Sequence, residues 1–360
     1  MVAAGSCAGS RQDLAGGVSG LTPTELDEFR QRGFLVKRGL YADADLQPLR
    51  VAITAALDAE CDLLIAQGAM TEAEACCDAP FETRFGRVVH GLDTDSPAQR
   101  RILASMQDLF LTGRVEHAAD SAAVADALLA CIRQETVLDC VTSVIGEDII
   151  GSSTFRIRGK IPLWESGRDQ PYFPGEVPWH QDAGYMLAHC DAHLIVTCWV
   201  PLVDATVGNG CMHVYPWRFD QGVLPHYFGR RDRYIWIPDD HLPDTDPVPV
   251  EMRAGDVLFL TNMTPHATFD NVSDTTRWSM DLRYGPMSIP NNVDEAPESY
   301  TESRRPDSMA CAPTEADFVI RDSAHPDRDV VDGEVFTEIR MRYARQYVNP
   351  GRGWTHIRDR

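Results

Sequence analysis

The chain has 360 residues, of which 44% are hydrophobic and 24% are charged. This composition is typical of a soluble globular protein with enough apolar mass for a sizeable core. The net charge of -21 argues against nucleic acid or an anionic membrane as a partner, because phosphate binding requires a basic surface. The ten cysteines form no C-x-x-C motif, which is typical of free thiols in a reducing compartment and predicts a cytoplasmic protein.

Residues 1–20 are rich in Gly, Ala and Ser and are predicted to be a disordered N-terminus. This segment has neither a basic region nor an apolar stretch, so we expect no signal peptide. We also expect no membrane span, because no apolar run in the chain approaches about 18 residues.

Residues 21–147 are predicted to be a mostly helical region that packs on the core. Thr22-Pro23-Thr24-Glu25 has the pattern of a capping box at the start of a helix. A short strand at 33–37 follows, and then a longer helix through about Gly68 that Asp43 or Asp45 would cap. Further helices are expected at 97–112 and 121–145.

Residues 148–290 have the pattern of short strands. Segments rich in β-branched residues and bounded by turn residues lie at 149–158, 193–200, 211–215, 257–260 and 277–284. They predict a sandwich or a double-sheet jelly roll. Long irregular stretches at 165–176 and 218–250 are expected to be lid insertions. Residues 291–360 are expected to form a polar, Pro-rich C-terminal extension with a terminal helix near 331–346.

Three His-x-Asp sequences occur in the chain: His180/Asp182, His189/Asp191 and His325/Asp327. In an extended strand, alternate side chains share one face, so such a pair supplies two of the three ligands of a facial metal site. Residues 325–327 lie in a polar stretch with no apolar strand to hold them, and residues 189–193 are more typical of a loop leading into a strand. Pro178 favours an extended backbone just before His180, which makes His180 and Asp182 the best candidates.

The third ligand must come from another strand, and His266 follows the strand predicted at 257–260. Residues 270–274 favour a hairpin turn. That hairpin would place His266 opposite Arg277, with Cβ atoms about 5 Å apart. A cation beside a metal-binding His requires an anion between them, which predicts a ligand carboxylate clamped by Arg277. The alternative is an ordinary core His beside a cross-strand Arg salt bridge.

Four segments occur in order along the chain: PWHQD at 178–182, GCMHVYP at 210–216, AGDV at 254–257 and WSMDLRY at 278–284. Together they resemble the phytanoyl-CoA dioxygenase family, in a likeness that covers roughly residues 25–290. The resemblance implies a double-stranded β-helix (a jelly roll, cupin-like). The expected fold class is therefore a mainly β core with a mostly helical N-terminal region and a C-terminal extension. It also implies Fe(II), 2-oxoglutarate as co-substrate, and O₂, with ascorbate in a supporting role.

The resemblance also implies roles for individual residues. His180, Asp182 and His266 would be the iron ligands. Arg277 would hold the 2-oxoglutarate carboxylate, and Thr268 matches a hydroxyl residue that helps to hold it.

Two further residues match the family less specifically. Lys160 resembles a family Lys near the co-substrate, and Trp199 resembles an aromatic wall of the pocket. A surface Lys and a core Trp are the alternatives for these two.

The expected reaction is hydroxylation of a small organic substrate, with decarboxylation of 2-oxoglutarate to succinate and CO₂. Asp182 favours hydroxylation, because related halogenases have a small residue in place of the carboxylate ligand. Two other functions stay open: a jelly-roll binding module without redox activity, and an iron oxygenase that does not use 2-oxoglutarate.

Candidate substrate-pocket residues are large side chains in or beside the irregular stretches: Trp164, Tyr172, Phe173, Tyr185, Met186 and Trp217. Arg230, Arg231 and Arg233 are candidates for contacting an anionic substrate such as a CoA ester, with a solvated charged loop as the alternative. The remaining histidines, including His213, His226 and His241, are expected to be structural or lid residues.

Overall fold

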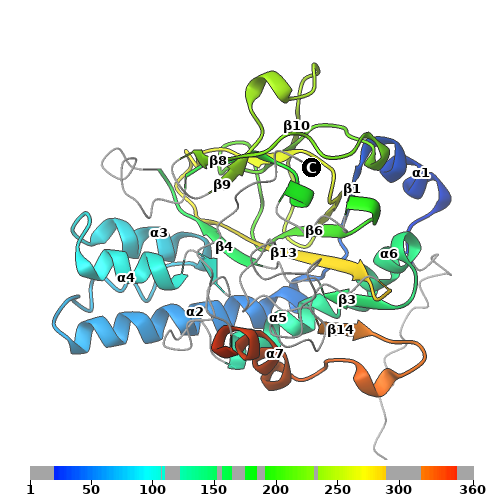
Figure 1. The fold of residues 1–360 in the computed structure, drawn as a ribbon. Coiled ribbons are helices and arrows are strands. Elements are labelled where there is room, and N and C mark those ends of the chain that lie inside the picture. The colour runs from blue at the N-terminus through cyan, green and yellow to red at the C-terminus, as the bar shows by residue number, and fades with distance from the viewer. Residues whose placement is uncertain are drawn as a thin grey trace, which may run out of the picture.

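The computed structural model describes residues 20–106, 108–109, 122–151, 156–163, 175–184, 191–230, 234–288 and 318–346. The described part consists of two facing antiparallel sheets, a small two-stranded ribbon and seven helices (Figure 1). None of the described helices is both long enough and apolar enough to cross a membrane.

The larger sheet has its strands in the order β1 (Phe34–Lys37), β11 (Val257–Thr261), β6 (Val196–Pro201), β13 (Arg277–Pro286), β3 (Ile149–Gly151) and β14 (Phe318–Arg321). Strand β4 (Arg156–Lys160) also pairs with β13, and β2 (Asp108–Leu109) pairs with β4. The long strand β13 is therefore the centre of this sheet. It pairs with β6 on one side and with β3 and β4 on the other.

The smaller sheet has the order β10 (Val248–Val250), β7 (Met212–Val214), β12 (His266–Thr268) and β5 (Val177–His180). A two-stranded ribbon, β8 (Tyr227–Arg230) with β9 (Tyr234–Trp236), lies next to it, where Ile237 N donates to Trp179 O over 2.7 Å.

The two sheets face each other across a compact apolar cluster. Leu258 and Leu260 of β11 contribute from the larger sheet, and Met212 and Val214 of β7 contribute from the smaller one. Because side chains alternate along a strand, the intervening residues of β11 point the other way, and Phe259 belongs to the core beneath the helices.

The helices cover the outer face of the larger sheet. In Figure 1, α2 (Asp43–Ala66), α5 (Ala122–Ile132) and α7 (Gly333–Gln346) lie on the side of this sheet away from β10. The other helices are α1 (Pro23–Arg32), α3 (Phe81–Gly91), α4 (Pro97–Met106) and α6 (Glu135–Ile145). On β13, Leu282 and Tyr284 point into this helical layer, and Tyr284 Oη donates to Ile132 O over 2.9 Å.

The expected fold class is wrong in one respect, because the protein is a mixed helix and sheet structure and is not mainly β. The larger sheet buries both of its faces, so its outer face requires a cover, and helices on both sides of residue 148 supply it. Strand β1, within the region predicted to be mostly helical, is itself part of this sheet.

Local predictions near the N-terminus have mixed outcomes. The capping box is confirmed, because Glu25 N donates to Thr22 Oγ1 and Thr22 N donates to Glu25 Oε2. The prediction that Asp43 or Asp45 caps α2 is wrong, because Ala42 holds that position. Asp45 instead accepts from Ala42 N over 2.7 Å, so its carboxylate still satisfies a backbone donor at the helix start.

Other boundaries differ by a break in an element. The helix predicted at 121–145 is two helices, α5 and α6, that meet where the Gln134 side chain accepts from Glu135 N. The strand predicted at 149–158 is divided between β3 and β4. Most of the stretch at 165–176 lies outside the described residues, whereas the stretch at 218–250 contains β8, β9 and β10.

Candidate metal and anion site

Two histidines on adjacent strands of the smaller sheet lie side by side. His180 ends β5 and is the register partner of His266, the first residue of β12. Their ring centroids are 4.2 Å apart. The prediction that these two side chains come together from different strands is therefore confirmed.

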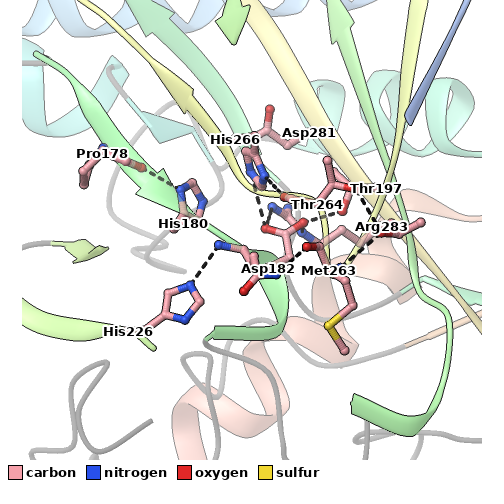
Figure 2. Close-up of polar contacts among 12 residues, drawn as sticks. Pro178, His180, Asp182, Thr197, His226, Met263, Thr264, His266, Asp281 and Arg283 are labelled. Carbon is pink, nitrogen blue, oxygen red and sulfur yellow. Dashed lines mark hydrogen bonds and ion pairs between the residues drawn. The ribbon is translucent and has the colours of Figure 1, made fainter. Parts of the chain in front are cut away.

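In both rings, Nδ1 lies next to a backbone carbonyl. His180 Nδ1 lies 2.9 Å from Pro178 O, and His266 Nδ1 lies 2.9 Å from Thr264 O (Figure 2). A carbonyl only accepts, so each Nδ1 carries the hydrogen, which leaves the lone pair of each imidazole on Nε2. Burial, reinforced by the nearby His266, lowers the pKa of His180 well below its usual value, so this ring stays neutral and able to bind a metal.

Asp182 completes the group, but not in the way that the strand pattern predicted. Strand β5 stops at His180, and Asp182 begins a short 3₁₀ turn, Asp182–Gly184. The turn nevertheless directs the carboxylate to the imidazoles, and Oδ1 lies 3.8 Å from His266 Nε2. In the described part of the chain, His180, Asp182 and His266 are the one group of three or more such side chains whose ligand atoms converge, all within 4.8 Å of one another.

Asp182 is fully buried, and two donors from the larger sheet hold it. Arg283 Nε donates to Oδ2 over 2.9 Å and Arg283 Nη2 donates to Oδ1 over 2.8 Å. Thr197 Oγ1 also donates to Oδ2. Burial alone would raise the pKa of Asp182, but the charge and hydrogen bonds of the Arg283 guanidinium outweigh burial and hold the pKa below its usual range, so the carboxyl is ionised.

Gln181 stands between His180 and Asp182 in the sequence, and its side chain is hydrogen-bonded to backbone on two other segments. Its side-chain amide donates to Gly222 O over 3.0 Å and to Met263 O, and its Oε1 accepts from Leu224 N over 2.7 Å. These bonds tie the strand end to the residues before β8 and to the turn before β12.

His226 supports the same turn. Its Nε2 accepts from Gln181 N over 2.9 Å, and its Nδ1 contacts Leu224 O over 2.7 Å. A Cβ at Gly184 would lie 2.6 Å from the His226 ring, so only glycine allows the turn after Asp182 to approach it. His226 is therefore a structural residue next to the site, as expected.

A second polar group lies at the end of the larger sheet where β13 begins. Arg277 and Lys160 are register partners on β13 and β4, and both are almost fully buried. Arg277 Nη1 donates to Ser279 Oγ over 2.8 Å, and its guanidinium carbon lies 5.2 Å from the centre of the Trp199 ring. Arg277 Nε, however, is buried with no hydrogen-bond partner among the described residues.

Lys160 joins this end of the larger sheet to the strand that carries His266. Its Nζ donates to Thr268 Oγ1 over 2.8 Å and to Phe269 O over 2.6 Å. A Cβ at Gly210 would lie 2.5 Å from Phe269 O and 2.9 Å from Lys160 Cδ, so a glycine there makes room for both. Lys160 is therefore not a surface lysine.

Burial lowers the pKa of both cations at this end of the sheet. Burial lowers the pKa of Arg277 to about 10. Burial and the neighbouring Arg277 lower the pKa of Lys160 well below its usual value. Two buried cations side by side favour an anion between them, because a negative charge would relieve both shifts.

The predicted hairpin between His266 and Arg277 is wrong. Strand β12 pairs with β5 and β7 in the smaller sheet, whereas β13 pairs with β3, β4 and β6 in the larger one. Residues 269–276 therefore carry the chain from one sheet to the other. His266 and Arg277 face the same interior from opposite sheets.

Several other candidate residues lie outside the described part of the chain: Trp164, Tyr172, Phe173, Tyr185, Met186, His189, Arg231 and Arg233. Trp217 is partly buried and its indole donates to Gly222 O over 2.9 Å. Arg230 ends β8, and His241 lies exposed in a 3₁₀ turn. His213 packs edge-on against Phe269, with ring centroids 4.8 Å apart.

Sequence reasoning missed Thr197 and Arg283. Arg283 lies an even number of residues after Arg277 on β13, so strand alternation places both on the face toward the smaller sheet. That spacing was readable from the sequence. Its partner was not, because Asp182 lies 101 residues away in the chain.

Comparisons with known proteins fit this geometry. The model of the phytanoyl-CoA dioxygenase family matches residues 29–279. The chain belongs to this family. It is 30% identical over 115 residues to a phytanoyl-CoA dioxygenase of Arabidopsis thaliana, a match that covers 31% of this chain and 40% of the relative.

A second relative is a methylphosphonate hydroxylase of Gimesia maris, 28% identical over 110 residues, which cover 31% of this chain and 39% of that protein. The chain thus aligns with about two fifths of the length of these relatives. Among solved structures, the apo form of ThoJ, a non-heme monooxygenase, aligns with a TM-score of 0.50 at 17% identity. That alignment covers 89% of this chain and 96% of ThoJ, and it shows a common fold.

Proposed function

We propose that this family member is a non-haem Fe(II)/2-oxoglutarate-dependent dioxygenase that hydroxylates a small organic substrate. The observation that carries the proposal is the convergence of His180, Asp182 and His266, with both imidazoles presenting Nε2. Two neutral nitrogen donors and one carboxylate on one side of an ion are the donor set of the non-haem Fe(II) oxygenases that use a facial triad.

Iron bound there would supply the oxidising chemistry, with O₂ as oxidant and with decarboxylation of 2-oxoglutarate to succinate and CO₂. The residues of the chain do the rest. The carbonyls of Pro178 and Thr264 fix the tautomer of the two histidines, and Arg283 keeps Asp182 ionised. These contacts orient the three ligands.

The buried cations supply the second part of the proposal. Arg277 would hold the distal carboxylate of 2-oxoglutarate through the edge of its guanidinium that includes the unpartnered Nε. Lys160 and Thr268, already joined by a hydrogen bond, would contact the same carboxylate. Trp199 would form the wall beneath the Arg277 guanidinium.

The proposed architecture is a double-stranded β-helix core over residues 148–290, built on the larger and smaller sheets, with β1, β2 and β14 added to the larger sheet from outside that range. The mostly helical region of residues 21–147 packs on this core, with a C-terminal extension over 291–360. Support comes from the opposed sheets and from residues 269–276, which cross from one sheet to the other between β12 and β13.

A substrate panel tests this function. Purified protein is incubated with Fe(II), 2-oxoglutarate, O₂ and ascorbate, and succinate is measured with and without each compound. We expect succinate formation that depends on one class of compound and that Asp182→Ala abolishes. Succinate formed equally by the wild type and by Asp182→Ala, whatever compound is present, contradicts the proposal.

A further inference from the structure

Two neighbouring strands of the larger sheet aim a donor at the same carboxylate. Arg283 of β13 and Thr197 of β6 are register partners. Arg283 donates to both oxygens of Asp182, over 2.9 Å from Nε to Oδ2 and over 2.8 Å from Nη2 to Oδ1. Thr197 Oγ1 donates to Oδ2. In Figure 2, Arg283 and Thr197 lie on the side of Asp182 away from His180.

The two carboxylate oxygens differ in their surroundings. Oδ2 accepts from both Arg283 and Thr197. An ionised carboxylate oxygen has two lone-pair directions, so these donors use the full capacity of Oδ2. Oδ1 is the oxygen that lies 3.8 Å from His266 Nε2. Oδ1 is therefore the oxygen that faces His266 Nε2.

From this asymmetry, and resting on the proposed iron centre, we propose that Arg283 is a positioning residue that fixes Asp182 as a ligand through Oδ1 alone. Thr197 assists by donating a hydrogen bond to Oδ2, the oxygen that is not the proposed ligand atom. The clamp keeps the carboxylate plane fixed and prevents both oxygens from binding the metal at once, which preserves open positions for co-substrate and O₂.

The burial of the pair makes the clamp necessary. Asp182 is 0% exposed, and its donors Arg283 and Thr197 are 7% and 3% exposed, so water cannot take the place of either donor. A buried carboxylate is strongly disfavoured unless it is paired and hydrogen-bonded. The planar fork of Arg matches both carboxylate oxygens, whereas the ammonium of Lys is a point charge that cannot set the carboxylate plane.

The same contacts separate Arg283 from Arg277, although both lie on β13 and face the smaller sheet. The fork of Arg283 is engaged by Asp182 through two atoms. Arg277 donates from Nη1 to the Ser279 hydroxyl, and its Nε has no hydrogen-bond partner among the described residues. The structure therefore assigns Arg283 to the metal ligand and leaves Arg277 for the co-substrate.

Cobalt binding provides a readout that does not depend on turnover. Co(II) is titrated into the metal-free full-length protein while its visible absorption is recorded, and thermal unfolding is measured on the same samples. The variants are Arg283→Gln, Arg283→Lys, Thr197→Val and Thr197→Ser. The matched control is Arg84→Gln, because Arg84 is also a buried arginine, paired with Asp58 over 2.6 Å in the helical layer.

We expect Arg283→Gln to weaken Co(II) binding roughly 10- to 100-fold, the usual cost of losing a partner that orients a metal ligand. Its Co(II) absorption should also change shape, because Asp182 is free to rotate. Arg283→Lys should restore the affinity in part but not the spectrum. Thr197→Val should show a smaller loss that Thr197→Ser reverses, so the inference stays testable even if Arg283→Gln folds poorly.

Arg84→Gln should lower the unfolding temperature and leave both the Co(II) affinity and the spectrum unchanged. The inference is overturned if the Arg283 and Thr197 variants keep the wild-type affinity and spectrum, or if they change only as much as Arg84→Gln does. If the wild type itself binds neither Co(II) nor Fe(II), the proposed function fails first and the positioning role with it. Wild-type binding with unchanged variants defeats the positioning role alone.

Discussion

The candidate site has a metal end (His180, Asp182 and His266) and an anion end (Arg277 and Lys160). The protein neutralises the charge at the metal end but leaves the charges at the anion end unpaired by an anion among the described residues. At the metal end, the Asp182 carboxylate accepts hydrogen bonds from Arg283 and Thr197. At the anion end, Arg277 and Lys160 lie next to each other, and Arg277 Nε has no partner among the described residues. The first end is neutralised by the protein itself, whereas the second carries two adjacent cations.

This difference indicates what each end requires from solution. At the metal end, the protein itself supplies the partners that orient each candidate ligand. At the anion end, burial disfavours the charged forms of Arg277 and Lys160 and lowers the pKa of both side chains. A dianionic co-substrate would supply the negative charge that the anion end lacks.

The largest expected effect breaks the metal end. Asp182→Ala removes the anionic ligand and leaves Arg283 buried without its carboxylate, so we expect loss of bound iron and of all succinate formation. Iron is measured by metal analysis after gel filtration. Asp327→Ala is the matched control, because Asp327 belongs to another His-x-Asp sequence in an exposed 3₁₀ turn. Equal iron content in the two variants would argue against the assigned ligand.

The next largest effect breaks the anion end alone. Arg277→Met should weaken 2-oxoglutarate binding roughly ten- to hundredfold, since a hydrogen bond to a charged group contributes about 1.5–3 kcal/mol. Iron binding should stay at the wild-type level, because Arg277 lies in the other sheet from the two histidines. Calorimetric titration of the iron-loaded protein with 2-oxoglutarate measures the affinity, and metal analysis after gel filtration measures the bound iron. An unchanged affinity for 2-oxoglutarate would favour an oxygenase that does not use it.

We expect the affinity for 2-oxoglutarate to depend on pH through the protonation of Lys160. Burial and Arg277 lower the pKa of its ammonium in the free protein, and a bound dianion would raise it again. Below the lowered pKa, free protein and complex are both protonated, and the affinity is constant. Above it, only the complex holds the proton, so the affinity falls as pH rises, by up to about tenfold per pH unit.

The measurement for Lys160 is calorimetry in two buffers of different ionisation enthalpy, which reports proton uptake on binding. Lys160→Arg should remove the uptake and flatten the profile, because the guanidinium stays charged at every pH used. A wild-type affinity that is constant from about pH 7 to pH 9.5, with no proton uptake, would contradict a role for this lysine.

The smallest expected effect concerns Thr268. Thr268→Val removes a hydroxyl that Lys160 Nζ contacts over 2.8 Å. One neutral hydrogen bond contributes about 0.5–1.5 kcal/mol, so 2-oxoglutarate affinity should fall about two- to tenfold with no change in iron binding. Thr268→Ser should retain most of the wild-type affinity. A loss as large as that of Arg277→Met would mean that Thr268 acts on the fold of β12 instead.

The ligand candidates were predictable because local chemistry limited the choices. Pro178 favours an extended approach, and a polar or loop context removed the other two His-x-Asp sequences. The exact geometry was not predictable, because β5 ends at His180 and a 3₁₀ turn places Asp182. A continued strand and a strand followed by a 3₁₀ turn can both place the Asp182 carboxylate next to His180. The His-x-Asp pattern does not distinguish these two conformations.

Pairings between distant segments were the part that sequence could not supply. A turn-like segment between two strands suggests a hairpin, yet residues 269–276 connect different sheets. The flanking strands pair with other strands instead, β12 with β5 and β13 with β6. Helix α3 was missed although its buried residues, such as Phe85 and Val89, have helical spacing. Strand β14 was missed because it is a short element in a polar region, stabilised by pairing with β3.

The most direct test of the central claim uses anaerobic spectroscopy. Wild-type protein is mixed with Fe(II) and then with 2-oxoglutarate, in the absence of O₂. If the two ends hold one iron and one co-substrate together, a weak visible charge-transfer band appears only when both are present, and Arg277→Met requires more 2-oxoglutarate to produce it. The absence of this band at saturating 2-oxoglutarate, together with no bound iron, would contradict the account.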